Sequence, residues 1–344
     1  MGVIRRAVVI GNGFPNSENQ SIGLVRALGL SDKNVLYRIS RYKGGINEWL
    51  HWLPVSLHKR INHMIRHFRG YSQSLLTSQG KQLTPQSSET GVSAGLDGPL
   101  LVVASGRDTI SIASSTRQLA SENDFVVQIL HPRLQLNRFD LVITPRHDYY
   151  PLTPSAREQV FRFLRTWITP HEPPDNHVVL TVGALHQIDF ATLHNSASAW
   201  HDEFAPLPKP LLVVNTGGPT RNCRYDVDIV QLTASILSVL VSCGSVRLSF
   251  SDKTPQKVSD VIIRELGNNP KVYIWDGQDS VIMISEACCT GKPVYVMGAE
   301  LCRWKLAEFH RTLRELGVAR PFTGSEDMSE NWSCPPLNDT GPSS

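Results

Sequence analysis

The chain has 344 residues, of which 41% are hydrophobic and 19% charged, and its formal net charge is +3 at pH 7. This composition is typical of a soluble globular protein with one large or two ordinary domains. The small net charge argues against a nucleic-acid binder, and no apolar run approaches the roughly 18 residues that a membrane-spanning helix needs.

The N-terminal residues, MGVIRRAVVIGNG, contain only a short β-branched run and predict the first strand of a fold rather than a signal peptide. The six cysteines form no C-x-x-C pair, so the sequence predicts neither a zinc site nor a disulfide framework. These features together indicate a protein that is cytosolic or faces the cytosol.

A strand, a polar loop and a helix recur in that order along the chain. Strands are predicted at 7–13, 100–106, 125–131, 139–148 and 178–184, with helices at 17–30, after 106 and near 190–203. PLPKP (206–210) interrupts the series, which resumes with strands in LLVVNT, SVRLSFS, KVYIWDG and KPVYVMG. Such alternation indicates parallel sheets that are covered on both faces.

We therefore predict two Rossmann-like α/β domains that face each other across a cleft. The N-terminal domain is predicted at 1–205 and the C-terminal domain at 211–325, with HEPPDN (171–176) as the other candidate boundary. Residues 80–99 are polar and rich in Gly and Ser, which predicts a disordered loop. Residues 326–344 are interpreted as a loose tail.

Ligands of parallel α/β sheets lie at the carboxyl ends of strands, next to helix N-termini. The loops predicted there contain Gly11, Asn12 and Gly13 in the first domain, and Gly217 and Gly218 in the second. The first loop lacks the dinucleotide fingerprint, because Asn16 stands where its third glycine would fall. Both loops also have a simpler interpretation, since a strand needs some turn to enter a helix.

Candidate catalytic residues are few. Arg107 could bind a phosphate and Asp108 could act as a base, although a salt-bridged loop explains this pair equally well. Histidines at element ends show no metal-site spacing. We predict no catalytic residue, no metal site and no cofactor.

The stretch VYIWDGQDSVIMISEACCTGKPVYVMG (272–298) resembles a segment that lines nucleotide-sugar pockets. A strand is predicted to end at Asp276-Gly277, and a helix to start at once at Asp279-Ser280. Ser280 would lie at the helix start, and Glu286 would lie where a ribose-binding carboxylate is expected. We therefore take Ser280 and Glu286, with the glycine loops, as a vestigial nucleotide-sugar site; the alternative is that Asp279-Ser280 only caps a structural helix.

Residues 49–69, WLHWLPVSLHKRINHMIRHFR, place apolar side chains at helical spacing and contain no acidic residue. The other face carries Lys59, Arg60, Arg66 and Arg69. This pattern is typical of an amphipathic helix on an anionic membrane surface, and equally of a helix packed on its own sheet.

Six stretches together resemble the mitochondrial fission family of plants named after the Elongated Mitochondria phenotype. They are NTGGPTRNCRYDVD, HPRLQLNRFDLVITPRHD, VLTVGALHQID, RLSFSDKTP, NNPKVYIWDG and ISEACCTGKPVYVMGAE, and the resemblance runs from about Val8 to Asp339. The resemblance implies a two-domain architecture like that of GT-B glycosyltransferases. It also implies an adaptor on the cytosolic face of the mitochondrial outer membrane that helps recruit a dynamin-related GTPase for division.

The sequence departs from the family pattern in two places. Members usually carry a further helix and strand between the equivalents of WDG and DSV, whereas only Gln278 separates Gly277 from Asp279 here. Members also continue past PPLNDT into a final helix. Both differences are typical of alternative splicing or of a gene-model choice, and they predict an incomplete C-terminal sheet. A GT-B-type glycosyltransferase and a nucleotide-binding module without catalysis remain the alternatives to the adaptor.

Overall fold

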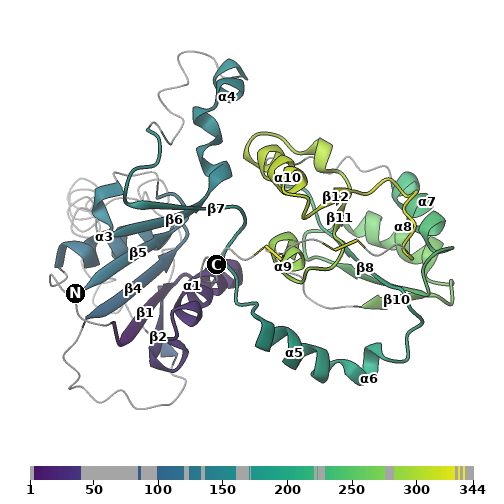
Figure 1. The fold of residues 1–344 in the computed structure, drawn as a ribbon, viewed down its shortest axis with the longest axis horizontal. Coiled ribbons are helices and arrows are strands. Elements are labelled where there is room, and N and C mark those ends of the chain that lie inside the picture. The colour runs from purple at the N-terminus through teal and green to yellow at the C-terminus, as the bar shows by residue number, and fades with distance from the viewer. Residues whose placement is uncertain are drawn as a thin grey trace, which may run out of the picture. The chain divides into compact units, whose positions relative to one another are not determined.

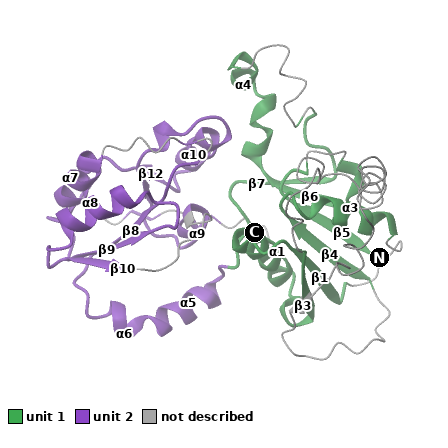
Figure 2. Cartoon of the chain, turned by 180° about the vertical axis from the view of Figure 1, so that it is seen from behind, with its two compact units in different colours: residues 1–187, 339–344 green, residues 188–338 purple. Residues whose placement is uncertain are grey.

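The computed structural model describes residues 4–39, 84–86, 99–119, 124–132, 136–159, 170, 172–220, 223, 229–275, 283–329, 332–333 and 336–337. The chain folds into two compact units, residues 1–187 with 339–344 and residues 188–338 (Figure 2). Each unit is an α/β structure built on parallel strands, which confirms the predicted fold class. The cleft predicted between the two domains stays a prediction.

The N-terminal unit contains a seven-stranded sheet in the order β3-β2-β1-β4-β5-β6-β7 (Figure 1). All strands are parallel except β3, which pairs antiparallel with β2. The strands are β1 (Arg6–Gly11), β2 (Asn34–Arg38), β3 (Thr84–Gln86), β4 (Leu100–Ser105), β5 (Phe125–Ile129), β6 (Leu141–Pro145) and β7 (Val178–Thr181). The helices are α1 (Pro15–Ala27), α3 (Ile110–Leu119) and α4 (Pro154–Gln159), with short 3-10 turns at Ser31–Lys33, Leu136–Arg138 and Arg146–Leu152.

Period-2 alternation along the strands makes two cores in this unit, one on each face of the sheet. Val9 and Val103 face one side and pack in a cluster with Val25 of α1. Val102 faces the other side and packs with Ile110 of α3 and with Phe139. Burial of each such side chain stabilises the fold by about 1.5–3 kcal/mol, which explains why both faces of these strands are apolar.

The C-terminal unit contains a three-stranded parallel sheet in the order β10-β9-β8 and a separate two-stranded parallel pair, β11-β12. The strands are β8 (Leu211–Thr216), β9 (Ser245–Phe250), β10 (Val272–Trp275), β11 (Tyr295–Val296) and β12 (Arg320–Pro321). The helices are α5 (Phe190–Ala199), α6 (His201–Phe204), α7 (Ile229–Val239), α8 (Gln256–Leu266), α9 (Met283–Cys289) and α10 (Lys305–Glu315), with a 3-10 turn at Ala299–Leu301. Buried residues of α7, α8, β9 and β10 form one core cluster, against which Leu212 and Val214 of β8 pack.

The proline segment 206–210 belongs to the C-terminal unit. The carbonyl of Pro208 accepts a hydrogen bond from Ser245 Oγ at 2.7 Å, and the carbonyl of Pro210 accepts from Gly244 N at 2.9 Å. We predicted a boundary between domains here, whereas the two compact units divide after Gln187. The physical reason for the difference is that these prolines are fixed to the turn that leads into β9.

An aromatic sandwich around Arg247 fixes α6 to the same sheet. The guanidinium carbon lies 4.6 Å from the ring centroid of Phe204 and 4.8 Å from that of Trp275. Arg247 Nη2 also pairs with a carboxylate oxygen of Glu203 at 2.6 Å, and Arg247 is buried. These contacts join α6 to β9 and β10, so the chain from Trp200 onward is part of the C-terminal unit.

Two regions with predicted irregular structure are only partly described. Within 80–99, Thr84–Gln86 form β3, so the prediction of a disordered loop is wrong for these three residues. In the predicted tail, Glu326 accepts hydrogen bonds from Thr323 N and Gly324 N, and Met328 N donates to Ser242 Oγ at 3.0 Å. The start of the tail is therefore bound to α7 and its C-terminal turn. The segment 49–69 lies outside the described residues.

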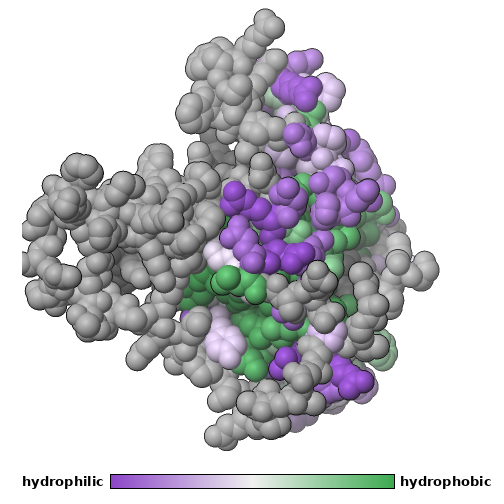
Figure 3. Space-filling view, turned by 90° about the vertical axis from the view of Figure 1, so that its left-hand side faces the viewer, coloured by the Kyte–Doolittle hydropathy of each residue, from purple (hydrophilic) through white to green (hydrophobic). Residues whose placement is uncertain are grey.

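Hydrophobic residues gather in the middle of the side shown in Figure 3, between hydrophilic residues and residues that are not described. Among the described residues of the N-terminal unit, the large apolar side chains that are exposed come from four separate places: Phe14, Leu28, Leu119 and Val179. They do not define a docking surface.

Among the described residues, no helix is long and apolar enough to cross a membrane.

Candidate functional site

The N-terminal sheet places its candidate loop where α/β sheets bind ligands. From β1 the chain first adds β2 on one side and later adds β4 on the other, so the strand order reverses between β1 and β4. Ligands of such sheets bind at this switch point. Gly11 ends β1 there and Asn12 and Gly13 follow it, and Gly106 to Asp108 follow β4. Asn12 Nδ2 donates to Asp108 Oδ2 at 3.4 Å, so the structure brings the two predicted loops together.

Two backbone N–H groups of the first loop are already bonded within the chain. Gly13 N donates to Glu18 Oε1 at 2.8 Å, and Phe14 N donates to Asn12 Oδ1 at 3.1 Å. Pro15, the first residue of α1, has no N–H to offer. A phosphate at a helix N-terminus needs these donors. Glu18 therefore takes the position that an anionic ligand would take in a working loop.

Glu18 is itself held by Arg38 at the end of β2. Arg38 Nε lies 3.0 Å from Glu18 Oε1, and Arg38 Nη2 lies 2.8 Å from Glu18 Oε2. The Glu18 side chain is only 6% exposed, and the pKa of Arg38 is raised by the hydrogen bond and the charge of Glu18. Sequence reasoning missed both residues, because Glu18 looks like an ordinary first-turn acid and β2 was not among the predicted strands.

Glycine at position 11 serves this internal pair rather than a ligand. A Cβ on Gly11 would lie 2.5 Å from Glu18 Oε1. Arg107 and Asp108 do not form the salt-bridged pair that we considered: the Arg107 side chain is exposed, and within the described part of the chain no partner for it is found. The loop is thus built around a carboxylate of the protein.

In the C-terminal unit, the loop after β8 packs against the loop after β9. Thr254 Oγ1 donates to the carbonyls of Thr216 and Gly217, at 2.7 and 3.1 Å. A Cβ on Gly218 would lie 1.9 Å from the carbonyl oxygen of Lys253, whereas a Cβ on Gly217 would meet nothing within 4 Å. Gly218 is therefore required for contact between two loops, which accounts for it without a phosphate.

In the C-terminal sheet, the described strands extend from one side of β8 only. Strands β9 and β10 extend from one side of β8, and among the described residues no strand pairs with its other side. The carbonyls of Pro210 and Thr216 accept from the β9 side, so backbone groups of Leu211, Val213 and Asn215 point to the free edge. The Val213 side chain is 54% exposed. The loop after β8 therefore has a neighbouring loop on one side only.

Glu286 lies in α9 as predicted, and burial raises the pKa of its carboxyl group. Among the described residues, no group bonds to this carboxylate. Ser280 and the predicted helix start at Asp279 lie outside the described residues. The predicted helix end is close to the observed one, because α9 ends at Cys289 and Gly291 follows with φ 65°.

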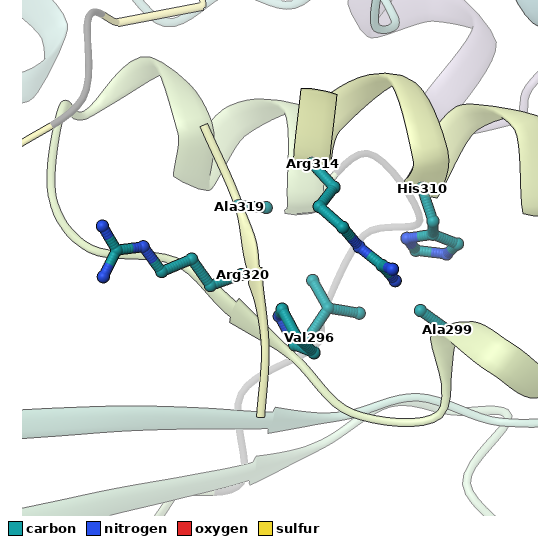
Figure 4. A pocket seen from close by; sticks show the side chains of 7 residues that line it. Val296, Ala299, His310, Arg314, Ala319 and Arg320 are labelled. Carbon is teal, nitrogen blue, oxygen red and sulfur yellow. The ribbon is translucent and has the colours of Figure 1, made fainter. Parts of the chain in front are cut away.

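A solvent-open hollow of about 10 Å³ lies between α10 and the β11-β12 pair (Figure 4). His310 and Arg314 point into it beside Val296 and Ala299, whereas Arg320 points away and lies 4.2 Å from the ring centroid of Trp332. Burial and the charge of Arg314 lower the pKa of His310, and Glu300 acts in the opposite direction. Ligand pockets usually measure about 300–1,000 Å³, whereas this hollow has room for about one water molecule. It is therefore too small for a sugar nucleotide.

No cluster of three or more His, Cys, Asp or Glu residues that could hold a metal is found in the described parts of the chain. The described geometry defines an α/β protein with two parallel sheets, in which the first glycine loop contacts the Glu18 side chain and the second packs against Lys253.

The chain belongs to the Mitochondrial fission ELM1 family, whose sequence profile matches residues 15–279 and 277–343. This confirms the resemblance inferred from the sequence. The chain is 62% identical to the Mitochondrial fission protein ELM1 of Arabidopsis thaliana, over 98% of this chain and 89% of the relative. It is also 28% identical to the uncharacterized protein RP120 of Rickettsia prowazekii, over 70% of this chain and 77% of that protein.

Among solved structures, a Listeria monocytogenes protein assigned as a UDP-N-acetylglucosamine 2-epimerase aligns with 98% of this chain and 93% of its own. The sequence identity is 11% and the TM-score is 0.45. A similarity this low supports no conclusion about the arrangement of the two units or about activity.

The comparisons also bear on the predicted internal deletion. The family profile matches in two pieces that meet at 277–279, where sequence analysis predicted a missing helix and strand. The alignment with the Arabidopsis relative spans 380 positions, more than the 344 residues of this chain. The relative therefore carries residues within the aligned region that this chain lacks. The free edge of β8 is consistent with a missing strand.

Proposed function

We propose that this protein acts in mitochondrial division as a non-enzymatic adaptor that helps recruit a dynamin-related GTPase to the mitochondrial outer membrane. The observation that carries the proposal is membership of the Mitochondrial fission ELM1 family, with 62% identity to the Arabidopsis protein of that name. Its place of action is then the cytosolic face of the outer membrane, with part of the protein in the cytosol.

The geometry of the loops supports the non-enzymatic part of the proposal. Glu18 bonds to an N–H group that a phosphate could use, and Gly218 is needed for packing against Lys253. Among the described residues, no strand pairs with one side of β8. A nucleotide-sugar enzyme needs loops from adjacent strands that converge on one ligand. The described residues provide no such set.

The test is to image mitochondria in cells that lack this gene, with and without the 344-residue chain restored. We expect long, interconnected mitochondria and a cytosolic GTPase in the deficient cells, and short mitochondria with GTPase foci after restoration. Normal division with foci in the deficient cells would refute the adaptor. Restoration by the longer relative but not by this chain would show that the 344-residue form lacks the function.

We propose the membrane contact at 49–69, a segment outside the described residues. Each Lys or Arg near an anionic surface contributes about 1 kcal/mol. Sedimentation with anionic liposomes at low salt should fall when Lys59, Arg60, Arg66 and Arg69 are all changed to Glu. The matched control changes four exposed basic residues elsewhere to Glu: Arg5, Lys33, Lys257 and Lys292. Equal loss in both variants would show that net charge, rather than this segment, drives binding.

One observation supports a second candidate function, which is the binding of a sugar nucleotide. Glu286 is a half-buried carboxyl group with a raised pKa and no partner among the described residues. Calorimetry and product detection with uridine and guanosine diphosphate sugars test it, with Glu286→Gln as the variant. Transfer or hydrolysis that requires Glu286 would refute the non-enzymatic adaptor. Binding without turnover would establish a nucleotide-binding module.

A further inference from the structure

Two cysteines far apart in the sequence lie opposite each other in the C-terminal unit. Cys223, in the segment after β8, forms an isolated antiparallel bridge with Cys302, which ends the 3-10 turn before α10. Neither cysteine is part of a disulfide; Cys223 is partly exposed and Cys302 is buried. The two thiols are also in hydrogen-bonding contact.

The backbone bonds show which kind of antiparallel pair this is. Cys223 N donates to the carbonyl of Thr220 at 3.3 Å, and Thr220 N donates to the carbonyl of Cys223 at 3.1 Å. Cys302 N donates to the carbonyl of Ala299 at 3.2 Å. The two cysteines therefore exchange no backbone bonds with each other, and they form a non-hydrogen-bonded pair.

That geometry is compatible with a disulfide. In a non-hydrogen-bonded antiparallel pair the Cα atoms are about 4.5 Å apart and the side chains approach closely. Disulfides span Cα separations of about 4.4–6.8 Å. A bond between Cys223 and Cys302 would therefore need little backbone movement, in contrast to the general case of two distant cysteines.

We propose that Cys223 and Cys302 form a reversible, redox-sensitive disulfide that ties the loop after β8 to the turn before α10. The site is independent of the proposed role in division. In a reducing compartment such bonds are typically transient and serve redox sensing. Burial and contact with Cys223 raise the pKa of Cys302 to about 12, so Cys302 stays protonated and the more exposed Cys223 reacts first.

The chemistry balances with hydrogen peroxide as oxidant. The Cys223 thiolate attacks one peroxide oxygen, the O–O bond breaks, and a sulfenic acid and one water are formed once the leaving hydroxide takes up a proton. Cys302 Sγ then attacks the Cys223 sulfur, the S–O bond breaks, and the S–S bond forms as a second water leaves with the Cys302 proton. Two thiols are oxidised by two electrons in all, and one peroxide is reduced to two waters.

The bond would act close to the hollow beside α10. Cys302 follows directly on the turn that contributes Ala299 to the lining, and His310 and Arg314 follow in α10 (Figure 4). The other end of the bond lies three residues after Thr220, in the segment that continues from Gly217 and Gly218. Oxidation would therefore restrict the candidate loop that packs on Lys253.

The experiment treats the folded chain with hydrogen peroxide, blocks remaining thiols with N-ethylmaleimide, and maps peptides without reduction. We expect a Cys223–Cys302 cross-linked peptide, the loss of two N-ethylmaleimide additions per chain, and full recovery of both after dithiothreitol. Deuterium uptake of residues 215–220 should become slower in the oxidised protein. The guanidinium-unfolded chain should show no preference for this pair.

Variants complete the test. Cys223→Ser and Cys302→Ser should each abolish the cross-link, whereas Cys243→Ser, which removes a buried thiol elsewhere in the unit, should leave it intact. The wild-type peptide map needs no variant and holds even if Cys302→Ser fails to fold. Over-oxidation of Cys223 to a sulfinic acid without a cross-link, or a preference for another cysteine pair, would overturn the proposal.

Discussion

The pair Glu18–Arg38 is expected to be asymmetric: Arg38→Gln should destabilise the N-terminal unit more than Glu18→Gln. The Glu18 side chain is 6% exposed and the Arg38 side chain 43%. Loss of the Arg38 charge leaves a carboxylate buried beside Gly13 without its cation. Loss of the Glu18 charge leaves a guanidinium that only has to turn toward water.

The exposures set the magnitudes. Removing one partner of a buried ion pair costs about 3–5 kcal/mol, and water that reaches the exposed partner lowers this cost. We therefore expect about 2–3 kcal/mol for Arg38→Gln. For Glu18→Gln we expect about 1 kcal/mol, because the amide oxygen can still accept the bond from Gly13 N.

The two units need not unfold together, so a single melting temperature does not report on this pair. Native-state hydrogen exchange, read by mass spectrometry on peptides from β1 and α1, measures the local free energy of opening. Arg5→Gln is the matched control, since Arg5 is exposed and carries the same charge. A cost for Glu18→Gln equal to or above that for Arg38→Gln would refute the reasoning.

Three further outcomes are expected. Gly218→Ala should lower the stability of the C-terminal unit by about 1–3 kcal/mol, because its Cβ would lie 1.9 Å from the Lys253 carbonyl oxygen. Gly217→Ala should not lower the stability, because a Cβ there meets nothing within 4 Å. Equal denaturation midpoints for the two variants would contradict this expectation. His310 has a lowered pKa, so its contribution to stability is present above the unfolded pKa of about 6.5 and lost as the pH falls. Unfolding midpoints should therefore drop on acidification, with a smaller slope in His310→Gln; an unchanged slope would show that other groups cause the drop. Insertion of the relative's extra residues at the break in the family match should protect alternate β8 amides from exchange, and unchanged protection would place the missing strand elsewhere.

The positions of the main strands were accessible from the sequence, because β1, β4, β5 and β6 are largely buried and appear as continuous apolar runs. Their order in the sheet was not predicted. Strand β2 was missed: its residues Asn34–Arg38 are only half-buried or exposed and include an arginine at the end. Strand β11 lies within the predicted strand KPVYVMG, although it carries only two residues. Strand β12 was missed, because its two residues are too few for any period to be visible.

The site was less accessible, since its decisive contacts join residues from different elements. The sequence identifies the glycines at 11, 13 and 218 but not what lies against them. Glu18 fills the first loop only because β2 brings Arg38 beside it, and Lys253 meets Gly218 only because two loops cross. These pairings depend on tertiary packing, which local spacing does not encode.

The sandwich of Arg247 between Phe204 and Trp275 bears on how the protein can be divided into fragments. A C-terminal fragment that starts at Leu211, after the prolines, would lack Glu203 and Phe204. Arg247 on the central strand β9 would then lose its counter-ion and one of its two aromatic neighbours. It would also lack the carbonyls of Pro208 and Pro210, which accept hydrogen bonds from Ser245 and Gly244 at the start of β9. A fragment that starts at Ile188 retains all of these contacts. A fragment of the C-terminal unit should therefore include the proline segment 206–210 rather than begin after it.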